Sequence, residues 1–177
     1  SGIATLTARY VAAVAGTRAR IVDTRKTMPG LRLLDRQAVR DGGGVNHRFS
    51  LSDAVLAKDN HLAVLAASGI PIGDAIRGAR ARLGHTVHLE VEVDRLDQIE
   101  EVVAAGVDTI MLDNFALDEL RAGVDLIAGR ALVEASGGVT LETVGAIAAT
   151  GVDLVSVGAL THSVRALDLG LDVEVRA

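Results

Sequence analysis

Short apolar runs recur along the chain, and each is followed by a polar cluster or a helical pattern. Apolar side chains at every second position are typical of strands, whereas spacings of three and four are typical of helices. The pattern predicts a helix over 1–15 that ends at Gly16, and a helix that opens at Pro29 and closes at 42–44. It predicts strands over 19–23, 54–57, 86–93, 108–112, 131–135 and 153–157.

The alternation of strands with helices indicates a parallel sheet with right-handed crossovers. A doubly wound open sheet and a (β/α) barrel both meet this condition. In 86–93, His88, Glu90 and Glu92 share one face, whereas a strand between two helical layers would be apolar on both. We therefore expect one α/β domain over 1–177, a TIM-like (β/α) barrel that has fewer than eight strands and is incomplete. Asp94 is expected to be the N-cap of the helix after this strand.

Composition narrows the classes of function. The chain is 49% apolar and 23% charged, with a net charge of −5, which indicates a folded domain with no basic field for nucleic acid or an anionic membrane. Zero cysteines exclude disulfides, thiol chemistry and thiolate metal sites. No signal segment or apolar run long enough to span a bilayer is found, so we expect a cytoplasmic protein.

Cationic side chains are concentrated after the early strands. Lys26 and Lys58 are the two lysines among 18 basic residues, and Arg25, His47 and Arg48 are close to them in strand-end clusters. Parallel barrels bind ligands at the carboxyl ends of their strands, so these groups are expected to meet on one face. Guanidinium forks and ammonium groups gathered in an acidic protein indicate a polyanionic ligand; the alternative is ordinary surface salt bridges.

The later strand ends carry a different chemistry. Ser136, Gly137, Gly158 and His162 are suited to a phosphate site, because glycines let backbone N–H groups approach a ligand. Glu92 and Asp113 end consecutive strands and are candidate ligands for Mg²⁺ held partly through substrate phosphates, or are paired with the cations opposite. His85 is expected in a loop, and Glu134 within a strand to pair only locally. A cationic pocket, a phosphate site and two carboxylates together suggest phosphoribosyl transfer.

Seven motifs in this order resemble the quinolinate phosphoribosyltransferase family, which condenses quinolinate with phosphoribosyl pyrophosphate to give nicotinate mononucleotide, pyrophosphate and CO₂ in NAD biosynthesis. The motifs cover nearly the whole chain: Asp23-Thr24-Arg25-Lys26-Thr27, Gly42-Gly43-Gly44-Val45-Asn46-His47-Arg48, Lys58-Asp59-Asn60-His61, Glu90-Val91-Glu92-Val93-Asp94, Leu112-Asp113-Asn114-Phe115, Ser136-Gly137-Gly138 and Val157-Gly158-Ala159-Leu160-Thr161-His162-Ser163.

The resemblance implies a role for each matched position. The quinolinate carboxylates would be held by Arg25, His47, Arg48 and Lys58, and Lys26 would be shared with pyrophosphate. Catalytic roles would fall to Lys26, Lys58, Glu92 and Asp113, the two carboxylates facing ribose and Mg²⁺. The 5-phosphate would be bound by Ser136, Gly137, Gly158 and His162.

The family also places an α/β domain before the barrel, and in a homodimer the partner's copy of that domain contributes part of each site, including an arginine. This chain begins in what resembles the helix that enters the barrel, so we expect it to be a barrel portion with weak activity or none alone. The surface that the other domain would cover is expected to be apolar.

Three other functions remain open at this level. A related phosphoribosyltransferase could act on nicotinate or another base, although a monocarboxylate would leave buried positive charge unpaired. A Schiff-base aldolase would use Lys58 as its nucleophile. A non-catalytic phosphate-binding module would bind ligands without turnover.

Overall fold

Six parallel strands form one curved sheet in the computed structural model, which describes residues 1–174. The strands pair in the order β1-β6-β5-β4-β3-β2. Each of the six expected strands is present: β1 Arg20–Val22, β2 Ala54–Ala57, β3 His88–Val93, β4 Thr109–Asp113, β5 Leu132–Ser136 and β6 Leu154–Ser156.

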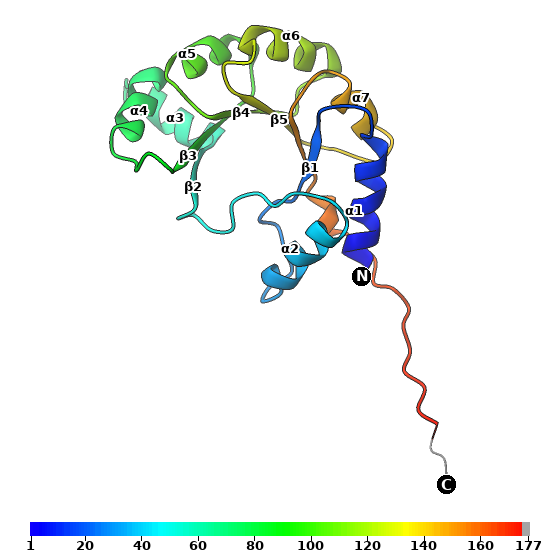
Figure 1. Ribbon diagram of the computed structural model, residues 1–177. Coiled ribbons are helices and arrows are strands. Elements are labelled where there is room, and N and C mark those ends of the chain that lie inside the picture. The colour runs from blue at the N-terminus through cyan, green and yellow to red at the C-terminus, as the bar shows by residue number, and fades with distance from the viewer. Residues whose placement is uncertain (175–177) are drawn as a thin grey trace.

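The helices identify the sheet as a barrel wall. α3 to α7 follow the outer side of the curved sheet, whereas a doubly wound sheet would carry helices on both faces (Figure 1). The helices are α1 Gly2–Ala13, α2 Arg32–Asp41, α3 Asp59–Ala67, α4 Ile72–Arg80, α5 Ile99–Ala104, α6 Leu117–Ile127, α7 Val144–Ala148 and α8 Ala159–His162, with a 3₁₀ turn at Leu96–Gln98.

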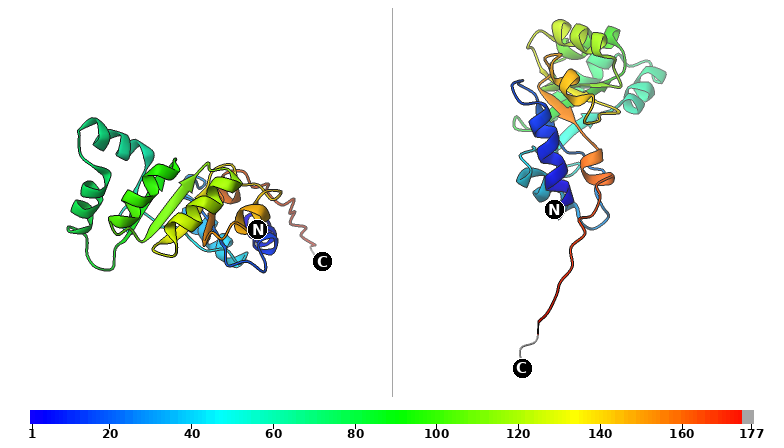
Figure 2. Two further views of the ribbon diagram at one scale, coloured as in Figure 1. Left: turned by 90° about the horizontal axis from the view of Figure 1, so that it is seen from above. Right: turned by 90° about the vertical axis from the view of Figure 1, so that its right-hand side faces the viewer.

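The barrel is not closed, as the sequence predicts. β1 and β2 lie at opposite ends of the pairing order, and the segment between them adds a single bridge between Val22 and Val45. The sheet forms an open arc in Figure 1, and in both views of Figure 2 the segment after α8 runs away from the body. One edge of the site is therefore made by loops instead of a continuous strand ladder.

Alternation along β3 shows how the strand divides the core from the site. Leu89, Val91 and Val93 are fully buried in the apolar core, where α5 contributes Ile99 and Val102. The opposite face of the same strand carries His88, Glu90 and Glu92 into the barrel interior. Apolar packing against the helices thus fixes the register that aims the acidic side chains inward.

Two predicted helix starts are wrong. α2 begins at Arg32, because Met28 N–H donates to Asp35 Oδ2 at 3.0 Å and holds the residues after Pro29 in a turn. Asp94 is not an N-cap, since its own N–H donates to Gln98 Oε1 at 3.1 Å and a 3₁₀ turn precedes α5. Both errors arise from local hydrogen bonds that delay the helix by several residues.

No single helix within residues 1–174 is long and apolar enough to cross a membrane. α3 and α4 reach that length and hydropathy only when they are taken together, and they are bent by 112° relative to each other.

Candidate active site

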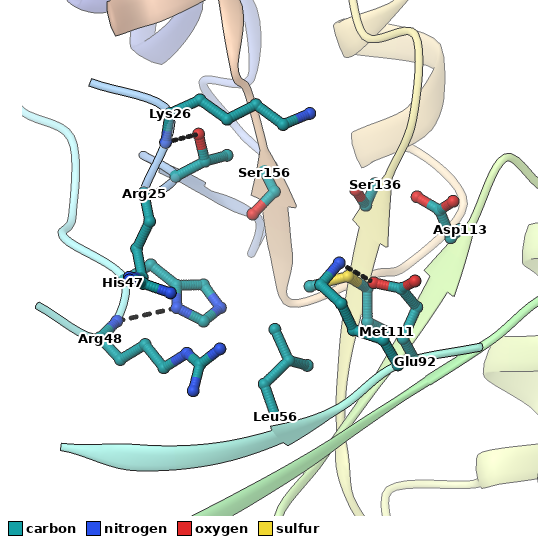
Figure 3. A pocket seen from close by; sticks show the side chains of 12 residues that line it. Arg25, Lys26, His47, Arg48, Leu56, Glu92, Met111, Asp113, Ser136 and Ser156 are labelled. Atoms are coloured by element: carbon teal, nitrogen blue, oxygen red, sulfur yellow. Dashed lines mark hydrogen bonds and ion pairs between the residues drawn. The ribbon is translucent and has the colours of Figure 1, made fainter. Parts of the chain in front are cut away.

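Two adjoining pockets open at the carboxyl ends of the strands. The cationic pocket, about 310 Å³ in volume, lies between the loops after β1 and the ends of β2, β3 and β4 (Figure 3). The glycine-rich pocket, about 470 Å³, lies over the ends of β5 and β6. They share walls formed by Thr24, Lys26, Asp113, Ser136 and Ser156, so they are two chambers of one site.

The structure brings every predicted site residue to one or both chambers. The cationic pocket is lined by Arg25, Lys26, His47, Arg48, Lys58, Glu92, Asp113 and Ser136. The glycine-rich pocket is lined by Lys26, Asp113, Ser136, Gly137, Gly158 and His162. His85 lies in an exposed turn outside both pockets, as expected for a loop residue.

Arg25 and Arg48 bring unpaired donors and positive charge to the cationic pocket. The Nε atoms of both are buried and have no hydrogen-bond partner in residues 1–174. Burial lowers the pKa of Arg48 below its usual value, and the neighbouring Arg25 lowers it further. Buried donors that lack partners are costly, and two crowded guanidinium groups repel each other, so an anion that accepts from both would stabilise the pocket.

A buried network of hydrogen bonds holds the loop that carries His47 and Arg48. Asp23 is fully buried just after β1 and accepts from His47 N–H at 2.6 Å and from Asn46 Nδ2 at 2.7 Å. Arg36 from α2 lies 3.4 Å from the same carboxylate and also donates to the carbonyl oxygens of His47 and Arg48. Burial raises the pKa of Asp23, although these donors act to lower it. Sequence reasoning missed Asp23 and Arg36 as supports of the site.

His47 is engaged inside the protein at both ring nitrogens. Nδ1 accepts from Arg48 N–H at 2.8 Å, and Nε2 lies 3.0 Å from Glu90 Oε2 and 3.9 Å from Glu134 Oε1. Burial lowers the pKa of His47, but Glu90 and Glu134 outweigh burial and raise it. The Arg48 N–H acts in the opposite sense, because a nitrogen that accepts a hydrogen bond cannot also carry a proton. The ring therefore lines the pocket without a free nitrogen.

The carboxylates Glu92 and Asp113 face the cations across the pocket (Figure 3). Lys58 Nζ donates to Glu92 Oε2 at 2.7 Å, and Asn114 Nδ2 donates to Asp113 Oδ2 at 2.6 Å. Each carboxylate has a second oxygen outside these bonds, and hard oxygen donors of this kind suit Mg²⁺, which binds through one or two carboxylates and substrate phosphates. The donor chemistry is compatible with Mg²⁺, which stays a prediction, and Glu92 is also paired with Lys58.

Close packing explains the glycines of the second chamber. Gly137 has a φ of +96°, and a Cβ there would lie 2.1 Å from Asn114 Oδ1. A Cβ on Gly158 would lie 2.9 Å from His162 Nε2. Thr161 Oγ1 donates to Lys26 O at 2.6 Å and so ties the β1 loop to α8. The backbone at Gly137 strongly favours glycine, whereas at Gly158 the His162 ring would have to move, and Lys26 lies at the border of the chamber.

An incomplete (β/α) barrel with a cationic pocket that opens into a glycine-rich one defines an anion-binding barrel domain. Residues 3–172 match the family described as "Quinolinate phosphoribosyl transferase, C-terminal domain". The chain belongs to this family, which confirms the resemblance drawn from the motifs.

Known relatives agree along the whole chain. A nicotinate-nucleotide pyrophosphorylase [carboxylating] from Mycobacterium leprae is 50% identical over 98% of this chain and 60% of its own length. The solved nicotinate-nucleotide pyrophosphorylase from Ehrlichia chaffeensis is 43% identical with a TM-score of 0.90, over 98% of this chain and 62% of its own. NadC from Streptococcus pyogenes is 49% identical with a TM-score of 0.87, over 95% of this chain and 57% of its own. The chain thus spans about three fifths of these relatives.

Proposed function

We propose that this domain transfers a phosphoribosyl group from phosphoribosyl pyrophosphate to quinolinate, with decarboxylation, to give nicotinate mononucleotide, pyrophosphate and CO₂. The observation that carries the proposal is the pair of buried, unpartnered Nε atoms of Arg25 and Arg48 in a pocket that joins a glycine-rich chamber. The names of the relatives support the same reaction.

Quinolinate fits the cationic pocket by charge and size. Arg25, Arg48 and Lys58 would pair with its two adjacent carboxylates, and the aromatic ring would lie against Leu56 and Met111 on the pocket wall. Nicotinate carries a single carboxylate and would leave buried positive charge without a partner, so the pocket favours the dicarboxylate.

The glycine-rich chamber would hold the phosphoribosyl group. Ser136, Gly137, Gly158 and His162 would bind the 5-phosphate, and Lys26, at the border of the two chambers, would face the departing pyrophosphate. The ribose would then lie beside Glu92 and Asp113. As pyrophosphate leaves, the anomeric carbon becomes oxocarbenium-like, and the quinolinate nitrogen forms the new bond while these carboxylates stabilise the positive charge.

Mg²⁺ would be held by Glu92 and Asp113 and, when bound, would offset charge on the pyrophosphate. Decarboxylation breaks the bond between a ring carbon and its carboxylate. The electron pair that remains on the carbon is stabilised by the adjacent, now cationic ring nitrogen, and a proton from water then converts this carbon to C–H. Arg25 and Arg48 would hold the carboxylate in place until the bond breaks.

We further propose that the site is completed in a homodimer by the partner's preceding domain. Exposed apolar side chains gather on α2 and the loops beside the cationic pocket, as expected for a surface that another domain covers: Met28, Leu31, Leu33, Leu34, Phe49 and Leu51. The cytoplasmic location stays a prediction.

The two other functions are less well supported. An aldolase would need Lys58 as a neutral amine, whereas its 2.7 Å ion pair with Glu92 holds it as the ammonium ion. A binding module without turnover would have no need for two carboxylates where the chambers meet, and it predicts that Glu92→Gln and Asp113→Asn would leave ligand binding intact with no turnover by the full-length protein.

Calorimetric titration of the full-length protein with quinolinate, and separately with nicotinate, tests the proposal. We expect quinolinate to bind at least about tenfold more tightly, a difference of about 1.4 kcal/mol. Release of pyrophosphate and CO₂ on addition of phosphoribosyl pyrophosphate should follow. Equal or tighter binding of nicotinate would refute the quinolinate assignment.

A further inference from the structure

A buried polar cluster lies beneath the cationic pocket and has no part in the reaction as described so far. Glu90 on β3 is 3% exposed and Glu134 on β5 is 1% exposed. Ser156 on β6 donates its hydroxyl to Glu134 Oε1, and His47 caps the cluster from above at 3.0 Å from Glu90. Glu90 Oε1 is buried without a partner in the part of the chain that the structure describes.

Burial of two neighbouring carboxyl groups disfavours a negative charge on both at once. Burial and the charge of Glu90 raise the pKa of Glu134 to about 8, although His47 and Ser156 act to lower it. The titratable groups that act most on Glu134 are Glu90 and His47, and the cavity of about 380 Å³ that Glu134 lines also holds Arg20, Arg36, Arg48, Asp53 and His88. The neighbouring interior positions of β4 and β6 are Met111 and Ser156. Glu134 is therefore protonated at neutral pH, and its proton would supply the donor that Glu90 Oε1 lacks.

Ligand atoms of His47, Glu90 and Glu134 lie within 4.8 Å of one another, close enough to share a metal ion. The hydrogen bonds of the His47 imidazole exclude a metal at this place. Its Nδ1 accepts from Arg48 N–H, so the ring proton is on Nε2, the nitrogen that a metal would need. Nε2–H is thus left to donate to Glu90.

The cluster reaches the ligand through Arg48. Nε2 of His47 is fixed by Glu90, and Nδ1 of the same ring fixes the backbone of Arg48 at 2.8 Å. Arg48 then aims its guanidinium into the cationic pocket, with Nη1 on Ala54 O at 2.9 Å and Nε free for an anion. Ser156, which is bonded to Glu134, lies in the wall that both chambers share.

We propose that Glu90 and Glu134 are positioning residues for the dicarboxylate, acting through His47 on Arg48: Glu90 orients the ring at Nε2, and Glu134, held by the Ser156 hydroxyl, lies against this pair from β5. The identity of the ligand rests on the proposed function, whereas the orientation of the His47 ring by Glu90 is independent of it.

The variants Glu90→Met, Glu134→Met and Glu134→Gln of the full-length protein test this. Methionine keeps the volume and removes the acceptor, whereas glutamine keeps the shape and the donor of a neutral acid. We expect both methionine variants to raise the KM for quinolinate at least about tenfold with little change in the KM for phosphoribosyl pyrophosphate. Glu134→Gln should restore most of the loss seen in Glu134→Met.

The pH profile separates positioning from general damage. In the wild type, quinolinate binding should weaken above about pH 8, where Glu134 ionises beside Glu90. In Glu134→Gln that weakening should disappear. The proposal would be overturned if quinolinate binding by Glu134→Gln still weakened with the midpoint of the wild type. It would also be overturned if Glu134→Gln raised the KM for quinolinate as much as Glu134→Met does. Neither outcome depends on whether Glu90→Met folds.

Nitrogen NMR of the His47 ring tests the positioning part without any ligand. The signal is assigned by its loss in His47→Gln. We expect a protonated Nε2 and an acceptor Nδ1, with a change in both shifts in Glu90→Met. A ring protonated on Nδ1 alone in the wild type would refute the proposal, whereas failure of quinolinate to bind a protein with the expected ring signals would refute only the proposed function.

Discussion

The two chambers of the site are built in opposite ways. The cationic pocket relies on long side chains from loops across the open edge of the barrel, which are held by buried polar networks around Asp23 and Glu90. The glycine-rich pocket relies on backbone at the ends of two hydrogen-bonded strands, with Gly137 and Gly158 in positions where a Cβ would collide. The cationic pocket thus depends on charged side chains and the glycine-rich pocket on the shape of the backbone. A substitution should therefore affect mainly one of the two chambers.

The largest effect is expected from Asp23→Ala. It leaves the buried Arg36 and the loop of His47 without their anion, so unfolding free energy should fall by about 3–5 kcal/mol. Urea unfolding measures it. Asp97→Ala removes an exposed ion pair with Arg95 and should cost less than about 1 kcal/mol. An equal loss in the two variants would contradict a special role for the Asp23 network.

Arg48→Ala should affect one chamber without the other. Removal of a guanidinium that pairs with a buried carboxylate should weaken quinolinate binding by about 2 kcal/mol or more, roughly thirtyfold. Binding of inorganic phosphate at the glycine-rich pocket should stay unchanged, and both are measured by calorimetry. Arg95→Ala, at an exposed arginine, is the matched control. Parallel loss of both ligands would show that the chambers are not independent.

Gly137→Ala is the reverse experiment. A side chain at φ +96° and 2.1 Å from Asn114 Oδ1 should cost about 1–3 kcal/mol of stability and weaken phosphate binding, with quinolinate binding nearly unchanged. Gly129→Ala also has a positive φ but meets nothing within 4 Å, so it reports the backbone strain alone. Thermal unfolding and calorimetry of the two variants separate collision from strain.

Taken per pH unit, the smallest change in stability comes from Glu134. Native Glu134 keeps its proton up to about pH 8, whereas the unfolded group releases it near the usual value of 4.5. Its contribution to stability is therefore complete below that value and is lost as the pH rises toward 8, by at most about 1.4 kcal/mol per pH unit. Unfolding free energies of wild type and Glu134→Gln should diverge across this window. Parallel curves would show that Glu134 is ionised in the native state.

Strand ends were the part of the site that the sequence could predict. Carboxyl ends of parallel strands meet on one face, so residues such as Arg25 and Gly158 could be placed together without knowledge of any contact. The polar face of 86–93 likewise predicted the barrel correctly. The helices α3 and α4 are not among the elements that the sequence predicts, and Gly69 and Pro71 interrupt the apolar pattern between them.

The supports behind the site could not be predicted in this way. Glu134 was expected to pair only locally, but it lies in the interior with Glu90 and Ser156, which come from other strands. The ring orientation of His47 depends on Glu90, which a local pattern does not reveal. Side-chain networks across a barrel are set by register between distant strands, and no short motif encodes that register.

At the open edge between β1 and β2, a side chain of the cationic pocket makes a contact that a neighbouring strand would make in a closed barrel. Arg48 reaches across this edge and donates to the carbonyl oxygen of Ala54, the first residue of β2. An anion that accepts from Nε would hold the same guanidinium from the pocket side while Nη1 stays on the carbonyl. Occupancy of the pocket would then be linked to the order of the sheet margin, so we expect amide exchange in β2 to slow when the acceptor is bound.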